Sequence, residues 1–169
     1  MFCQDGMQQQ MRGFEYSIDI GDNEPVCCKP PRYGPHETRV INTLTTALTN
    51  KNLIEDDYGP YGALIVLASK PHQEHFHWVD FIFRLCNSFR PINAKTRPFT
   101  FPVTRCDDAV EEIGDREFTI TLDLDSGYWQ VKLHKDAKEK TAFFTPEGKK
   151  HWNVMPMGIK MLMCSSWQW

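Results

Sequence analysis

A single aspartate stands out among the residues that could do chemistry in this 169-residue chain. Asp123 lies in residues 117–124, where apolar side chains alternate with Thr and Asp. That alternation is typical of a half-buried β-strand, and it places Asp123 on the polar face near the strand's end. Ser126 and Gly127 follow in a turn whose backbone amides could face a phosphate, because small residues let the main chain approach an anion. The pattern indicates a metal or phosphate site, or a carboxylate that only caps a turn.

Charge is distributed in blocks of opposite sign, although the net charge is only -3. Residues 61–106 contain six Lys or Arg against two Asp or Glu, and residues 126–169 contain seven against three. Between them, residues 107–125 contain eight acids and one Arg. Basic flanks around an acidic centre suit a site that holds phosphates against metal ions. Ordinary solvated surface charge would give the same counts, so both interpretations stand at this point.

Composition is that of a globular protein, with 41% hydrophobic and 24% charged residues. No apolar run approaches the roughly 20 residues that a membrane span needs, so we expect no membrane partner. The first residues lack the pattern of a secretory signal, which predicts an intracellular protein with reduced cysteines. Cys27 and Cys28 are adjacent and no Cys-x-x-Cys pair occurs, which argues against a structural zinc site.

The helices and strands that must position Asp123 are expected to begin after an irregular N-terminal segment. Residues 1–34 show turn signals and no sustained periodicity, which predicts a linker or extended arm. From Pro35 to Leu48, apolar residues recur at helical spacing, and Asn50 or Asn52 is suited to end the helix. One amphipathic helix is therefore expected here.

Two strands should then form a hairpin. The first is the apolar run 64–68, and the second is residues 81–90, where side chains alternate between two faces. The apolar face holds Phe81, Phe83, Leu85 and Phe89, and the other face holds Arg84, Cys86, Ser88 and Arg90. The loop between them contains His72, His75 and His77, but no acid or Cys partner is fixed nearby, so an inserted loop is favoured over a metal site.

The rest of the chain completes an α+β fold. A short helix that includes Cys106 should end at Gly114. After the strand at 117–124, residues 129–133 alternate again, and residues 141–154 predict a hairpin around Gly148. The expected architecture is an antiparallel sheet with packed helices.

Ordered motifs in this chain resemble a known family. LDLDSGYWQVKL and EKTAFFTPEGKKHWNVMPMG resemble the palm of reverse transcriptases of gypsy-type LTR retrotransposons. FRLCNSFRPINAKTRPFTFPVTRCDDAVEEIG resembles the fingers segment and the linker after it, and SIDIGDNEPVCCKPPRYGPHE resembles the connector before the polymerase in the Pol polyprotein. The resemblance implies an RNA-directed DNA polymerase, a nucleotidyltransferase, with a partial right-hand polymerase fold of fingers and the first part of the palm.

The resemblance also implies the metal site and its partners. Asp123 would be the first of three family aspartates that hold two Mg²⁺ (or Mn²⁺) ions, and the backbone carbonyl of Leu124 would help bind the metal of the nucleotide. Lys70 and Arg84 match the basic pair that closes over the triphosphate. The implied partners are an RNA/DNA template-primer and deoxynucleoside triphosphates, and the implied location is a cytoplasmic particle or the nucleus.

The remaining nucleotide-binding residues are also assigned by resemblance. Tyr128 matches an aromatic that lies under the incoming sugar and excludes a 2′-hydroxyl, although its position alone would also suit an ordinary half-buried tyrosine. Met157 stands where the family usually has Phe, and Met is a softer substitute. The implied nucleotide-binding set in this part of the chain is Ser126, Gly127, Tyr128, Met157 and Gly158.

The domain organisation implied by the resemblance has three parts: residues 1–34 as a connector arm, 35–160 as fingers and partial palm, and 161–169 as a divergent tail. The resemblance stops after Lys160, before the family's Tyr-x-Asp-Asp hairpin, so we expect a truncated chain that is inactive alone. The first interpretation is a fragment of a retrotransposon reverse transcriptase, whose intact parent transfers nucleotides. The alternative is a catalytically inactive relic with at most weak nucleic-acid binding. An unrelated RNA-binding α/β domain is disfavoured, because the predicted aromatic face lies opposite Arg84.

Overall fold

The computed structural model describes residues 10–11, 13–69, 83–97, 105–114 and 126–160, together with residues 118, 120 and 124. This part of the chain contains both helices and small, mostly antiparallel sheets, as the α+β interpretation predicts. None of the described helices is long and apolar enough to cross a lipid bilayer. The elements are β1 (Glu15–Tyr16), α1 (Pro35–Asn50), β2 (Ile54–Asp56), β3 (Leu64–Ser69), β4 (Phe83–Ser88), α3 (Arg90–Lys95), α4 (Cys106–Ile113), the 3₁₀ turn η1 (Gly127–Gln130), β5 (Lys132–Leu133), α5 (Lys135–Lys138), the 3₁₀ turn η2 (Glu139–Thr141), β6 (Phe143–Thr145) and β7 (Gly148–Trp152).

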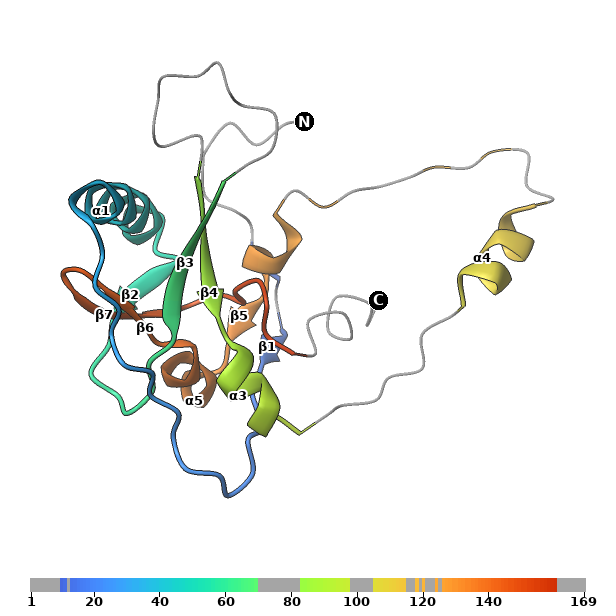
Figure 1. Ribbon diagram of the computed structural model, residues 1–169. Coiled ribbons are helices and arrows are strands. Elements are labelled where there is room, and N and C mark those ends of the chain that lie inside the picture. The colour runs from blue at the N-terminus through green and yellow to red at the C-terminus, as the bar shows by residue number, and fades with distance from the viewer. Residues whose placement is uncertain are drawn as a thin grey trace, which may run out of the picture.

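The long helix α1 confirms the predicted amphipathic helix. It begins at Pro35, which suits a first helical turn because the missing N–H is not needed there. The Glu37 carboxylate accepts a hydrogen bond from the Gly34 N–H at 2.8 Å and so satisfies one group at the helix start. Val40 and Ile41 are buried. The helix contacts β2 and β4 and covers one side of the body in Figure 1.

Under α1 lies a three-stranded antiparallel sheet in the order β2-β7-β6. The β6–β7 pair is the predicted hairpin, in which Thr145 faces Gly148. The edge strand β2 pairs with β7 from Ile54 opposite Trp152 to Asp56 opposite Lys150. Sequence analysis missed β2, because only Leu53 and Ile54 are buried there and no alternation is long enough to show.

The antiparallel β3–β4 hairpin is confirmed, with Leu64 opposite Ser88 and Ser69 opposite Phe83. Its loop lies outside the described residues, as do Phe81 and the three histidines. The second strand ends at Ser88, earlier than predicted. Arg90 instead begins α3, because Pro91 fits a first helical turn but cannot donate to a sheet.

The predicted strand at 117–124 is not seen at the residues that the structure describes. Phe118, Ile120 and Leu124 lie outside any strand, and their side chains are exposed. Asp123 lies outside the described residues. An alternating pattern forms a strand only where a neighbouring strand supplies hydrogen bonds and a surface to bury against, and the described sheets do not include these three residues.

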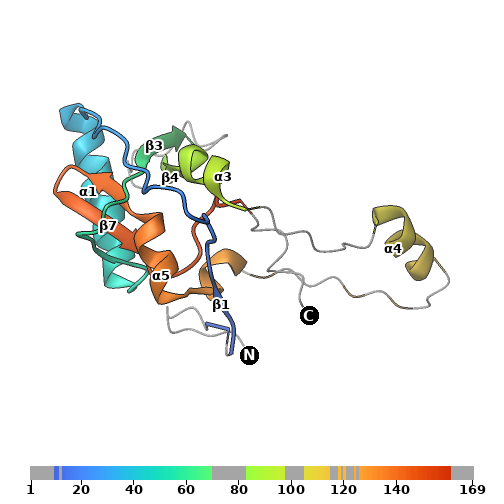
Figure 2. The ribbon, with the colours of Figure 1, turned by 90° about the horizontal axis from the view of Figure 1, so that it is seen from below.

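The alternation at residues 129–133 is also mostly not a strand. Residues Gly127–Gln130 form η1, and only Lys132–Leu133 pair, in parallel with Glu15–Tyr16 of β1. The predicted short helix is confirmed as α4, which ends before Gly114. Figures 1 and 2 show α4 apart from the packed body, and the Val110 side chain is exposed.

The N-terminal arm is more than a linker. Tyr16, Ile18 and Ile20 are buried, while Ser17 and Asp19 between them are exposed. This two-residue period is the signal that the sequence analysis missed, because the run is short and surrounded by turn residues. Figure 2 shows the arm, in blue, running across the packed body from β1 to α1. The arm therefore forms part of the hydrophobic core.

Candidate functional site

A groove of about 500 Å³ opens where α1, β4, η1 and the segment after β7 meet. Arg84 of β4 lies on one wall, and Met157 and Gly158 lie on another. Leu44 and Leu48 of α1 contribute an apolar side. It is the larger of two adjoining grooves, and we call it the larger groove. It brings together three residues that sequence analysis assigned to one site.

Arg84 is the second residue of β4 and pairs with Ala68 of β3. Its side chain is exposed, as is that of Cys86, while Phe83 and Leu85 are half-buried. The strand alternation therefore turns Arg84 away from the core, as predicted. A guanidinium in this position keeps its donors available for an anion.

Met157 and Gly158 belong to the turn formed by residues 157–160, after β7. Gly158 has φ of +93°, a conformation that residues with a side chain rarely adopt. The Met157 side chain is 60% exposed, so it projects at the edge of the groove and is not part of the core. A tight turn at this point presents backbone and a soft apolar side chain to a ligand.

Two tryptophans form the apolar end of the larger groove. The rings of Trp129 and Trp152 are stacked, with centroids 6.3 Å apart. The Trp152 Nε1–H donates to Asn87 Oδ1 at 3.1 Å. Asn87 Nδ2 is buried and has no hydrogen-bond partner among the described residues. These residues were not predicted for the site, because their contacts join η1, β7 and β4, which are separate elements of the chain.

A second groove, of about 370 Å³, adjoins the first and shares Cys86, Asn87 and Gly158 with it. Arg90 and Asn93 of α3 and Val66 of β3 also line it. Gly158 therefore lies between two depressions. Arg90 adds positive charge to a surface that already includes Arg84 and Lys51 of the larger groove.

The other predicted site residues are not in the wall of the larger groove. Ser126 precedes η1 in a left-handed conformation, with φ of +50°, and its carbonyl accepts from the Trp129 N–H at 2.9 Å. Gly127 and Tyr128 lie in η1 and are half-buried, and Leu124 is exposed before it. Only Trp129 of this turn lines the groove.

Lys70 and Asp123 lie outside the described residues, so the structure does not place the proposed metal site. Among the residues that are described, no group of three or more His, Cys, Asp or Glu side chains is arranged to hold a metal ion. That search did not include Asp123.

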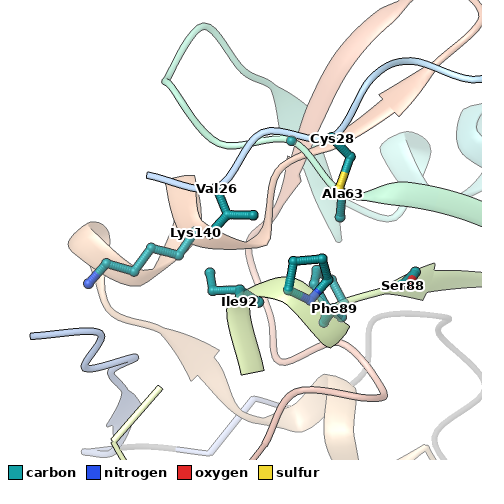
Figure 3. A pocket seen from close by; sticks show the side chains of 9 residues that line it. Val26, Cys28, Ala63, Ser88, Phe89, Ile92 and Lys140 are labelled. Atoms are coloured by element: carbon teal, nitrogen blue, oxygen red, sulfur yellow. The ribbon is translucent and has the colours of Figure 1, made fainter. Parts of the chain in front are cut away.

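A third depression is too small for a substrate. Figure 3 shows it under the arm, with Val26 and Lys140 on one side and Phe89 and Ile92 on the other. Its volume is about 10 Å³, which is the room that a single water needs. Lys140 Nζ donates to the Ile18 carbonyl at 2.6 Å, so this cation fastens the arm.

Comparison with known families decides the identity of this arrangement. Residues 80–162 match the family described as reverse transcriptase (RNA-dependent DNA polymerase). These residues belong to the reverse transcriptase family. The match includes β4, η1 and the turn at 157–160, and so it spans the walls of the larger groove except α1.

Curated relatives of this reverse transcriptase segment include retrotransposon polyproteins of Drosophila melanogaster. The Pol polyprotein of transposon 412 is 26% identical over 88% of this chain and 12% of its own length. The Pol polyprotein of transposon gypsy is 30% identical over 85% of this chain and 14% of its own length. The chain thus spans about an eighth of these relatives. The predicted resemblance to gypsy-type elements is confirmed.

Solved structures confirm the partial polymerase fold. The foamy viral protease-reverse transcriptase in complex with dsDNA has a TM-score of 0.70 at 16% identity, covering 93% of this chain and 29% of that one. The same enzyme in complex with an RNA/DNA hybrid has a TM-score of 0.66 at 16% identity, covering 89% of this chain and 20% of that one. At 16% identity, the similarity to these structures shows the fold alone.

Proposed function

We propose that this chain is the fingers and first part of the palm of an RNA-directed DNA polymerase, and that the larger groove receives the incoming deoxynucleoside triphosphate. One observation carries the proposal. Arg84, Met157 and Gly158 come from distant parts of the sequence, yet they line one groove. Their types suit a ligand with an anionic end and a flat, weakly polar body.

Arg84 is the proposed partner of the triphosphate. A guanidinium offers five N–H donors in a planar fork and stays charged at physiological pH, so it binds phosphate oxygens in pairs. When a phosphoryl group is transferred, negative charge grows on the oxygens that Arg84 would contact, and a fixed cation lowers the energy of that state. Lys70, next to the end of β3, is the proposed second cation.

The sugar and base are proposed to lie against the turn at 157–160. Gly158 has no side chain to keep the ligand away, and Met157 can adapt its shape to the ring. Tyr128, adjacent to the groove residue Trp129, is the proposed residue that excludes a 2′-hydroxyl. Such exclusion selects deoxynucleotides by a clash with the wrong substrate.

Reverse transcriptases generally depend on divalent metal ions. When bound, the two ions activate the primer hydroxyl and hold the triphosphate. Asp123 and the carbonyl of Leu124 offer the oxygen donors that Mg²⁺ prefers. Leu124 stands three residues before η1, whose Trp129 lines the larger groove. We propose Mg²⁺ or Mn²⁺ on this basis.

The second groove is proposed to contact the template-primer. Arg90 supplies positive charge for a phosphate backbone, and Gly158 joins this groove to the nucleotide groove. The foamy viral relatives of this fold are described in complex with dsDNA and with an RNA/DNA hybrid. Those complexes support a nucleic-acid partner for this chain.

Nucleotide titration of the full 169-residue chain tests the proposal. Trp129 and Trp152 lie at the groove, so bound nucleotide should change tryptophan emission. With dTTP and Mg²⁺, we expect Arg84→Ala to weaken binding by about tenfold, since one charged hydrogen-bonding partner is lost. Arg39→Ala is the matched control, because Arg39 is on α1 and its Nε contacts the Pro35 carbonyl of its own helix.

Two results would count against the nucleotide groove. The first is a wild-type chain whose emission does not respond to dTTP. The second is an Arg84→Ala chain that binds dTTP as tightly as the Arg39→Ala control. Either result would leave the family assignment in place and remove the assignment of the groove.

A further inference from the structure

We infer that Asn93 is a positioning residue that sets the geometry of the turn at 157–160, and through it the nucleotide groove. This inference rests on the proposed function of the larger groove. Asn93 Nδ2 donates to the Gly158 carbonyl at 2.7 Å. Asn93 Oδ1 accepts from the Lys160 N–H at 2.8 Å. One side chain thus binds the backbone on both sides of Ile159.

The carboxamide is chemically suited to this double contact. It carries a donor and an acceptor about as far apart as those of a peptide group, so it substitutes for a neighbouring backbone strand. Asp lacks the donor, and Leu, which has a similar size, lacks both groups. The double contact therefore depends on Asn at this position.

Asn93 is itself held in place. Its backbone N–H donates to the Phe89 carbonyl at 2.8 Å, at the start of α3. Phe89 and Ile92 beside it are almost fully buried. The side chain therefore projects from a helix anchored in the core, and the turn is fixed against that helix.

The other contacts of the turn lie mainly beyond Gly158. Met157 is mostly exposed, Gly158 has no side chain to pack, and Lys160 Nζ donates to the Thr96 carbonyl at 3.4 Å. Further along, Ile159 is buried and the Tyr16 hydroxyl donates to the Lys160 carbonyl at 3.0 Å. The arm therefore holds the far end of the turn, and Asn93 is the contact that fixes the carbonyl of Gly158.

Loss of the Asn93 contacts should affect a nucleotide and an inorganic polyphosphate differently. A nucleotide needs both Arg84 and the correctly placed turn. Tripolyphosphate needs Arg84, which is on β4 and does not depend on the turn. A residue that only stabilises the fold would change both affinities together.

The test uses the full chain with Asn93→Leu, and Asn42→Leu as the matched control. Asn42 also bonds across the fold, with its Nδ2 2.7 Å from Glu147 Oε1, but it lies on α1 away from the turn. We expect Asn93→Leu to weaken dTTP binding by about tenfold and to leave tripolyphosphate binding unchanged. Asn42→Leu should change neither affinity. Arg84→Ala should weaken both.

Hydrogen exchange of the Lys160 amide gives an independent readout. Its N–H is the group that donates to Asn93 Oδ1, so exchange at Lys160 should accelerate in Asn93→Leu and stay slow in Asn42→Leu. Unchanged exchange would overturn the inference, as would equal loss of dTTP and tripolyphosphate binding. If the wild-type chain binds neither ligand, the proposed function fails, and the exchange result alone then decides whether Asn93 holds the turn.

Discussion

The Asp57 carboxylate connects the end of β2 to β7 through polar contacts with two side chains. Its side chain is 2% exposed and follows β2, while its partners Lys149 and His151 lie on β7. Lys149 Nζ is 3.0 Å from Asp57 Oδ2, and His151 Nδ1 is 3.2 Å from Oδ1. The Gly59 N–H donates to the same carboxylate at 2.9 Å. Removing Asp57 breaks this largely buried ion pair and takes the carboxylate away from Lys149, which also donates to the Gly59 carbonyl.

We therefore predict that Asp57→Ala lowers the free energy of unfolding by about 3 kcal/mol, as is usual when a buried ion pair is broken. Asp56→Ala is the control. Asp56 is largely exposed, and a hydrogen bond from Lys150 lowers the pKa of its carboxyl group below the ordinary value. Because that pKa is lowered, the Lys150 contact stabilises the fold at neutral pH and is lost as pH falls through the folded pKa. Urea unfolding at pH 7 should show a much smaller effect for Asp56→Ala, and equal effects would contradict this ranking.

At single positions, the sequence predicts which residues belong to the site. It does not predict the contacts that hold those residues in place. The exposure of Arg84 follows from strand alternation, and Met157 and Gly158 follow from the order of the motifs. Asn93, Trp129 and Trp152 were not predicted, because their roles depend on contacts with residues remote in sequence. No local pattern encodes such a contact.

At the level of elements, the sequence predicts the helices and hairpins whose signals and hydrogen-bonding partners are close together in the chain. α1 has its start signal, its apolar stripe and its end within one continuous segment. The β3–β4 and β6–β7 hairpins pair neighbours along the chain. By contrast, β1 pairs with β5 from across the chain, and its short alternation looks irregular in isolation. Distance in sequence separates the confirmed elements from the missed ones.

The arm gives a test at this scale. Ile18 is almost fully buried, and the neighbouring Ser17 is exposed on the opposite face. We predict that Ile18→Ala lowers the free energy of unfolding by about 2–4 kcal/mol, as truncation of a core isoleucine usually does. Ser17→Ala should change it little. Thermal or urea unfolding that finds Ile18→Ala as stable as Ser17→Ala would contradict a contribution of the arm to the core.

At the level of the whole molecule, the fold brings together parts of the chain that carry separate motifs. β4 supplies Arg84, α3 supplies Asn93, and the segment after β7 supplies Met157 and Gly158. The arm reaches the same turn through Tyr16. The order of motifs predicted the family and the partial polymerase fold, which the comparisons confirm. It did not predict the shared groove, which requires the three-dimensional arrangement.

We propose above all that the larger groove binds the incoming deoxynucleotide. Photocrosslinking tests it most directly: the full chain is mixed with Mg²⁺, an RNA template, a DNA primer and a deoxyuridine triphosphate that carries a photoreactive group on its base. After irradiation and digestion, mass spectrometry identifies the labelled peptides. We predict labels on β4 and on the turn at 157–160, competed by dTTP and reduced in Arg84→Ala. Labels confined to α4 or to the outer side of α1 near Arg39, with none at the groove, would contradict the account.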